Sequence, residues 1–226
     1  MATIYVFNND TGELERFTRA AGEPMPYNTA GTLTVAEFMG DRSMGWTDLY
    51  TMNAWNELRT AYGRPIVVEA ALQSISAHGC LANPQFYFGV AFMLASVDRG
   101  EMENLYDAVV EGGAFNHVDA YSRTGIMVDN RYMPSGIYDT AGLPNLFMGV
   151  RCNQVFAVQD ALNVFGYPLD TDGVFGQATK DAVRKFQQDH RLTPDGVITM
   201  LEWEAIFGTG CSIRFPDTQS ATPTAA

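Results

Sequence analysis

Residues 158–203 have the sequence VQDALNVFGYPLDTDGVFGQATKDAVRKFQQDHRLTPDGVITMLEW, which contains the same Asp-Gly-Val turn twice, at Asp172–Val174 and at Asp195–Val197. In each turn the aspartate can cap backbone N–H groups, and the glycine gives the backbone freedom that a tight turn requires. Apolar residues recur at helical spacing before, between and after the turns, namely Val155, Val158, Leu162 and Phe165, then Ala178, Ala182, Val183 and Phe186, then Trp203, Ile206 and Phe207. The pattern predicts a compact three-helix unit at residues 154–210.

The preceding part of the chain mixes strand and helix patterns. The expected elements are a β-hairpin at Thr3–Arg19, a helix capped by Thr34 with Glu37 in a capping box, a helix at Leu49–Tyr62, a buried strand at Ile66–Val68, and a helix around Leu105–Val110 that stops at Gly112-Gly113. The sequence therefore predicts an α+β protein. Its expected divisions are a hairpin lead-in at 1–31, a larger domain at 32–145, the three-helix domain at 154–210 and a disordered tail at 211–226.

Composition excludes several classes of protein. The chain has 226 residues, of which 46% are hydrophobic and 12% aromatic, so wholesale disorder is excluded. Its net charge of −12 repels phosphate backbones, and nucleic acid is therefore not an expected partner. Only 18% of residues are charged, against about 25% in ordinary soluble domains. Such sparse charge is consistent with a surface that is partly covered by a partner.

The first residues, MATIYVFNND, have no basic region and no long apolar run, so we expect no classical signal peptide. No stretch reaches the roughly 18–20 apolar residues of a membrane-spanning helix. Three cysteines, Cys80, Cys152 and Cys211, match no metal-binding spacing, and their odd number leaves at least one unpaired within a monomer. A bridge between two of them stays open, and buried free thiols are the favoured interpretation.

The segment from Val158 to Trp203 resembles the peptidoglycan-binding domain of many cell-wall hydrolases, through the ordered string VQDALN, DGVFGQAT, AV, FQ, DGV and W. The resemblance covers roughly residues 155–208 and implies a three-helix module that docks on bacterial cell-wall glycopeptide. Thr199 and Glu202 depart from it, since the family usually has Gly and Thr there. We expect ligand contacts among groups in and beside the turns, in particular exposed Tyr167 and Gln187, whereas most of the turn residues build the turn itself. The candidate ligand-binding residues are Tyr167, Asp172, Phe175 and Gln187.

A second set of motifs lies in residues 32–132. Leu33–Phe38 and Trp55–Ile66 open it, NPQFYFGVAFM (83–93) forms its centre, and GIMVDNR (125–131) closes it. These motifs resemble those of the zinc D-Ala-D-Ala carboxypeptidases and endolysins of the M15 type, whose centre reads Ser-Gln-His-x-x-Gly-x-Ala-x-Asp and whose close reads Trp-Val-His-Phe-Asp-x-Arg. The resemblance implies an M15 peptidase-like fold for the larger domain.

The zinc ligands of that family, His, Asp and His, fall on Phe86, Met93 and Met127. Zinc requires lone-pair donors at about 2.0–2.2 Å, which phenylalanine lacks, and thioether sulfur suits zinc poorly. Asp119 falls near the catalytic carboxylate of the family, but without a metal-activated water it has nothing to deprotonate. The sequence therefore predicts a pseudoenzyme with no metal or other cofactor, in which Phe86, Met93 and Met127 touch and fill the former site.

Two catalytic alternatives remain. His78, Cys80, His117 and Asp119 hold donor types near the expected cleft, so a relocated zinc site is one alternative, although no ligand spacing supports it. A nucleophilic pair of Cys80 and His117 is the other, and it lacks an evident orienting group. The simpler interpretation is that both histidines bond to backbone groups.

Three functions follow in order of preference. The first is a non-catalytic peptidoglycan-binding protein, located at a bacterial cell wall, extracellularly or on a phage-like particle. The second is a structural subunit of a particle, appendage or coat, which would self-assemble through the exposed strand edge of the hairpin at Thr3–Arg19. The third is a peptidoglycan hydrolase with a relocated metal site.

Overall fold

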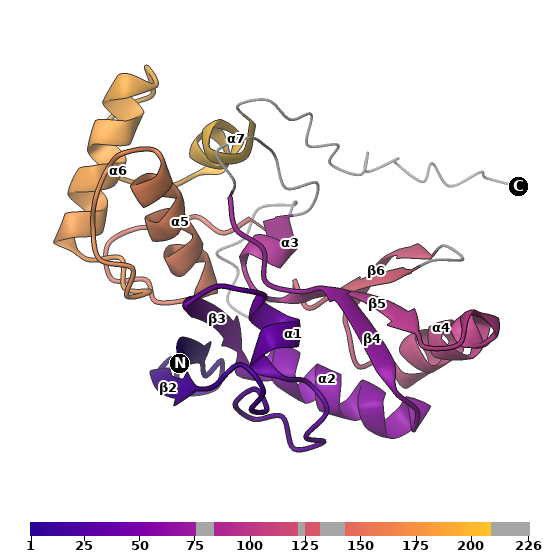
Figure 1. Ribbon diagram of the computed structural model, residues 1–226. Helices are drawn as coiled ribbons and strands as arrows, with labels where there is room; N and C mark the ends of the chain where they lie inside the picture. The colour runs from indigo at the N-terminus through magenta and orange to yellow at the C-terminus, as the bar shows by residue number, and fades with distance from the viewer. Residues whose placement is uncertain (76–83, 122–124, 132–142, 209–226) are drawn as a thin grey trace, which may run out of the picture.

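The computed structural model describes residues 1–75, 84–121, 125–131 and 143–208, and it has mixed α+β architecture as expected. A three-stranded sheet opens the chain (Figure 1). Strands β1 (Ala2–Phe7) and β2 (Leu14–Arg19) form the predicted antiparallel hairpin. The sequence analysis missed β3 (Met44–Asp48), which pairs in parallel with β1. Because β3 pairs with the second edge of β1, the exposed strand edge that was expected on the hairpin is that of β2.

The second sheet has the strand order β4-β5-β7-β6 and is antiparallel throughout. Its strands are β4 (Ile66–Ala70), β5 (Ala91–Ser96), β6 (His117–Tyr121) and β7 (Ile126–Asp129). Strand β4 lies at an edge of this sheet, and the Val67 side chain is 40% exposed. The prediction of a buried strand at 66–68 is therefore wrong, because alternate residues of an edge strand face outward.

Helices of the N-terminal part begin and end close to the predicted residues. Thr34 and Glu37 form the predicted capping box at α1 (Val35–Met39), and α2 spans Leu49–Tyr62 as expected. Gly63 and Gly113, at the ends of α2 and α4 (Met102–Gly112), adopt the left-handed conformation that terminates helices. Two short elements complete this part, α3 (Pro84–Tyr87) and the 3-10 turn η1 (Arg99–Glu101).

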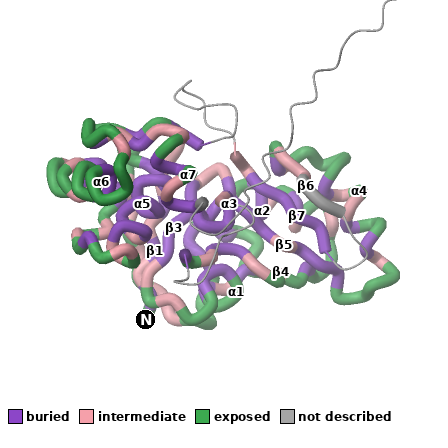
Figure 2. The backbone as a smooth tube through the Cα atoms, turned by 90° about the horizontal axis from the view of Figure 1, so that it is seen from above, coloured by how far each residue is buried: buried purple, intermediate pink, exposed green. Residues whose placement is uncertain are grey.

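The predicted three-helix unit is present as α5 (Asn153–Val164), α6 (Gln177–Asp189) and α7 (Met200–Gly208). Residues 143–151 run along both Asp-Gly turns, since Leu146 pairs with Ile198 and Arg151 pairs with Val174. We call residues 143–208 the C-terminal module. Every residue of α5 from Asn153 to Leu162 is buried except Asp160, which is half-buried. Helix α5 is therefore the core of the module, whereas α6 lies at its outer side with many exposed residues (Figure 2).

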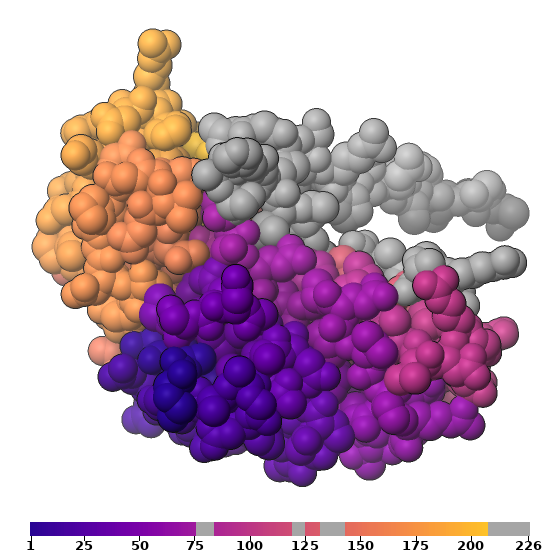
Figure 3. Space-filling model, in the orientation of Figure 1, coloured from indigo at the N-terminus to yellow at the C-terminus, as the bar shows by residue number. Residues whose placement is uncertain are grey.

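The module packs directly against the N-terminal part (Figure 3). The ring of Phe156 on α5 stacks on Trp46 of β3 at 5.6 Å between centroids and 7° between planes. At the other end of the contact, Phe88 packs edge-on against Trp203 of α7, with centroids 5.5 Å apart. Buried residues of both parts form one continuous hydrophobic cluster, so the two parts share a core.

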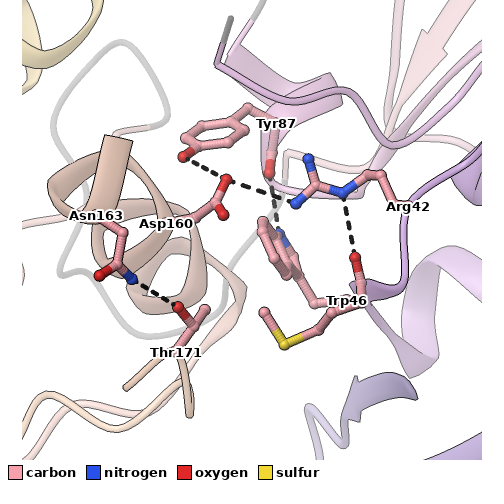
Figure 4. A network of polar contacts seen from close by, with 7 residues as sticks. Arg42, Trp46, Tyr87, Asp160, Asn163 and Thr171 are labelled. Carbon is pink, nitrogen blue, oxygen red and sulfur yellow. Dashed lines mark hydrogen bonds and ion pairs between the residues drawn. The ribbon is translucent and has the colours of Figure 1, made fainter. Parts of the chain in front are cut away.

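Polar contacts also cross this interface (Figure 4). Asp160 of α5 accepts a hydrogen bond from the Tyr87 hydroxyl at 3.2 Å and pairs with Arg42 at 3.5 Å. The Arg42 guanidinium lies over the Trp46 ring, 5.0 Å from its centroid, and the Trp46 indole N–H donates to the Tyr87 carbonyl at 3.0 Å. These contacts fix the orientation of the module. Within the described residues, no helix is long and apolar enough to cross a membrane.

Candidate functional site

The predicted remnant of a metal site forms a small apolar cluster that is separate from the main core. Phe86 of α3, Ala91 of β5 and Met127 of β7 are buried together, and Ala70 and Met93 pack against them. Met93 and Met127 are directly opposite each other in the β5–β7 pairing. The structure therefore brings Phe86, Met93 and Met127 together, as the sequence predicted, although they come from three separate elements.

Asp129 and Arg131 form a polar pair beside this cluster. Asp129 is fully buried, and its two carboxylate oxygens accept hydrogen bonds from Arg131, at 2.7 Å from Nε and 2.5 Å from a terminal nitrogen. A buried carboxylate is tolerated only when it is paired in this way. Gln85, on α3, is also buried. Both oxygens of the Asp129 carboxylate are therefore hydrogen-bonded to Arg131.

The residues of the two catalytic alternatives are only partly described. His117 begins β6 and is paired in register with Asp129. The backbone of Asp119 lies at an irregularity in β6, but its side chain lies outside the described part of the structure. His78 and Cys80 also lie outside it. Among the residues that the structure does describe, no three His, Cys, Asp or Glu side chains group as metal ligands would.

The first Asp-Gly turn of the C-terminal module is held by a glutamine. Gln159 of α5 accepts a hydrogen bond from the Gly173 N–H at 2.8 Å, and its amide donates to Asp172 at 2.8 Å. Gly173 has φ of 73°, and a Cβ placed there would lie 2.2 Å from the Phe156 ring. This turn therefore requires glycine both for its backbone conformation and for its contact with α5.

The second turn repeats this arrangement around Gln187 of α6. Gln187 accepts from the Gly196 N–H at 2.8 Å and donates to Asp195 at 2.9 Å. It also donates to Glu202 at 3.0 Å, and Glu202 in turn accepts from both the backbone and the hydroxyl of Thr199. Thr199 and Glu202, the two departures from the family pattern, therefore form a local hydrogen-bonded cap.

The four expected ligand-binding residues serve mainly to build the module. The expectation that Tyr167 and Gln187 are exposed is wrong, since their side chains are 9% and 0% exposed, and Phe175 is also fully buried. Tyr167 donates to Asp189 at 2.9 Å and lies edge-on to Phe186. Asp172 is exposed, but its Oδ1 accepts from Gln159 and from the Val174 N–H. Buried Phe175 and Gln187 cannot touch a ligand in this conformation.

Basic residues of the module, exposed except for half-buried Lys180, were given no role in the sequence analysis, although a signal was present. The module has four Lys or Arg residues between 152 and 206, and all of them fall within 12 positions, at Lys180, Arg184, Lys185 and Arg191. In a chain with only two lysines, this concentration on α6 and just beyond it could have been noticed.

Comparison with known proteins supports the assignment of the module. Residues 152–206 match the family described as "putative peptidoglycan binding domain", so the C-terminal region carries such a domain. A solved structure of a peptidoglycan-binding protein from Clostridioides difficile, in complex with glutamine hydroxamate, is 31% identical in the matched region. That match covers 29% of this chain and 41% of the other, with a TM-score of 0.28, so it does not relate the two folds as wholes.

Proposed function

We propose that the protein is a non-catalytic peptidoglycan-binding protein, in which a C-terminal wall-binding module is fixed to an inactivated scaffold of the M15 peptidase type. The observation that carries the binding function is the peptidoglycan-binding domain at residues 152–206. In this proposal the protein is located at the bacterial cell wall, and its role is to bind peptidoglycan rather than to cleave it.

Support for the loss of catalysis comes from the apolar cluster. A hydrated zinc ion needs an open position and nitrogen, oxygen or thiolate ligands. Phe86 and Met127 are each only 6% exposed and pack with Ala91 in the place where the resemblance puts the metal. The residues there therefore do not fit zinc, and we derive no catalytic step through a metal.

Binding is tested with the full chain and purified peptidoglycan sacculi. We expect the protein to sediment with sacculi and to remain in the supernatant without them. A protein that stays soluble at saturating amounts of sacculi would overturn the proposed function.

Catalysis is tested separately, after incubation with excess Zn²⁺ and dialysis. We expect far less than one zinc per chain by elemental analysis and no release of D-alanine from wall peptides. One tightly bound zinc per chain would overturn the pseudoenzyme assignment and would favour the hydrolase with a relocated metal site.

A structural subunit is the second candidate, and the free edge of β2 favours it. Strand β2 is the outer strand of its sheet, and an exposed edge can pair with a strand of another copy. Light scattering of the full chain over a concentration series distinguishes the candidates. Growth of the particle mass with concentration would support assembly, whereas a constant monomer mass would remove self-assembly as an explanation.

A further inference from the structure

The basic residues of α6 are placed against the second Asp-Gly turn. A Cβ added to Gly196 would lie 2.7 Å from Cγ of Lys180 and 3.2 Å from Cγ of Arg184. The aliphatic stems of both side chains therefore lie over the turn, in the space that the missing side chain of Gly196 leaves open. Residues four apart share one face of a helix, so Lys180, which is half-buried, and exposed Arg184 lie on the same face of α6.

Acidic residues in the described part of the module form no ion pair with these two side chains. Within the described part of the chain, the side chains of Lys180 and Arg184 make no hydrogen bond or ion pair. The nearby carboxylates are engaged by uncharged donors, since Asp181 accepts from Gln177, Asp189 from Tyr167, and Asp195 from Gln187. The two cations are therefore available to an anion from outside the protein.

Arg191 gives an independent indication at the end of the same helix. The N–H of Leu192 bonds to the Gln187 carbonyl at 2.8 Å, and the N–H of Arg191 bonds to the Gln188 carbonyl at 3.2 Å. This is a Schellman motif, whose left-handed position is usually glycine. Here Arg191 occupies it with φ of 61°. Glycine would adopt this conformation at lower cost, so a role for the exposed arginine side chain is one explanation of its presence here.

We propose that Lys180, Arg184 and Arg191 form an anion-binding surface that contacts the carboxylate groups of peptidoglycan peptides; this inference rests on the proposed function. We call these three residues the basic stripe. Peptidoglycan peptides carry carboxylates, and Lys and Arg donate charge-assisted hydrogen bonds to such groups. The whole chain has a net charge of −12, so a carboxylate-bearing polymer is repelled by most of the protein and needs basic side chains at the point of contact. The basic stripe therefore determines which side of the protein faces the cell wall.

The position of α6 suits this role. The opposite side of the module, formed by α5, is packed against the N-terminal part, whereas α6 lies on the outer side (Figures 1 and 2). A large insoluble polymer can therefore reach the stripe without moving the two parts of the protein.

The test measures sedimentation of the full chain with sacculi at low salt. The double variant Lys180→Gln/Arg184→Gln should bind roughly tenfold more weakly, because two exposed ion pairs are lost. The matched control is Lys185→Gln/Arg99→Gln, which removes the same charge. Lys185 belongs to the same helix but lies over the Tyr167 ring, and Arg99 is exposed in η1. The control should bind within twofold of the parent protein.

Chemical modification of the wall identifies the anion. Sacculi whose carboxylates have been converted to amides, with a carbodiimide and an amine, should bind the parent protein weakly. This binding should be as weak as that of the double variant to untreated sacculi. Sacculi from which acid has removed the phosphate polymers should bind the parent protein as strongly as untreated sacculi do. Loss of binding on phosphate removal alone would overturn the carboxylate assignment.

Arg191→Gly separates binding from folding. Glycine relieves the left-handed conformation, so this variant should unfold at a higher temperature while it binds sacculi more weakly. Equal binding by the parent, the double variant and Arg191→Gly would overturn the stripe and leave the proposed function intact. Absence of binding by the parent protein would instead overturn the proposed function, and the stripe with it.

Discussion

At Gly89 the backbone has φ of 71°, and an added Cβ would lie 2.0 Å from the carbonyl oxygen of Trp46. The Gly89 carbonyl also accepts a hydrogen bond from the Thr47 hydroxyl at 2.8 Å. This close approach joins the segment after α3 to β3, beside Trp46 and Phe88, whose rings contact the C-terminal module.

Gly89→Ala should therefore lower the free energy of unfolding by more than about 2 kcal/mol, because both the backbone conformation and the contact are lost. Gly22→Ala is the matched control, since a Cβ at Gly22 meets nothing within 4 Å. Urea denaturation of both variants measures the difference. Equal stability of the two would contradict the close packing of Gly89 against Trp46.

Burial of Cys152 predicts a pH dependence of stability. Desolvation raises the pKa of its thiol to about 12, although backbone N–H groups of Gln154 and Val155 oppose the shift. The unfolded thiol ionises near pH 8.5, whereas the folded protein keeps this thiol protonated to higher pH. The free energy of unfolding therefore falls as pH rises from about 9 towards 12. At pH 10 the loss due to this thiol is about 1–2 kcal/mol relative to pH 7.

Cys152→Ala should remove that part of the dependence. The difference in unfolding free energy between pH 7 and pH 10 should be smaller for the variant than for the parent protein. Identical differences would show that the thiol ionises equally in both states.

Glutamine side chains were the part of the candidate site that the sequence could not reveal. The two Asp-Gly-Val turns predicted loops and three helices correctly. Nothing local indicated that Gln159 and Gln187 lie beneath those loops, because their partners are eight or more positions away along the chain. The apolar cluster of Phe86, Met93 and Met127 was predicted only through the resemblance, since periodicity does not join three separate elements.

Among the elements, helices with local signals were predicted best. The cap of α1 and both ends of α2 were found in the sequence, because their determinants lie within a few residues. Strand β3 was missed, since its pairing with β1 depends on residues about 40 positions away. Whether β4 lies at the edge or in the centre of its sheet depends on the order of all four strands, which the local sequence does not contain. Its burial was therefore predicted wrongly.

At the same scale, Gln187→Ala tests how one helix holds a turn. Removal of the amide leaves the Gly196 N–H without its acceptor, and the Asp195 and Glu202 carboxylates each lose one of their donors. We expect a loss of about 2–3 kcal/mol in stability. Gln188→Ala, at the next and exposed position of α6, should change stability by less than about 0.5 kcal/mol. Thermal denaturation compares the two, and a similar loss in both would contradict the role of Gln187.

For the whole molecule, the shared core predicts cooperative unfolding. Phe156, Trp203 and Phe207 of the C-terminal module contact Trp46, Phe88 and Tyr87 of the N-terminal part. We expect one calorimetric transition for the full chain, although the sequence suggested separate domains at 32–145 and 154–210. Phe156→Ala should lower that single transition by an amount that corresponds to about 3–5 kcal/mol. Two resolved transitions, with only one affected by the substitution, would contradict the shared core.

Aromatic contacts between the two parts also limit how the module can be reused by protein engineers. Transplanted into a different host protein, residues 143–208 would bring the buried rings of Phe156, Trp203 and Phe207 to a new surface. Contiguous exposed apolar rings promote aggregation, so the graft would need either polar replacements at these positions or a host that offers counterparts of Trp46 and Phe88. The module is therefore not suited to transfer into another protein without redesign, even though its boundaries in the sequence are clear.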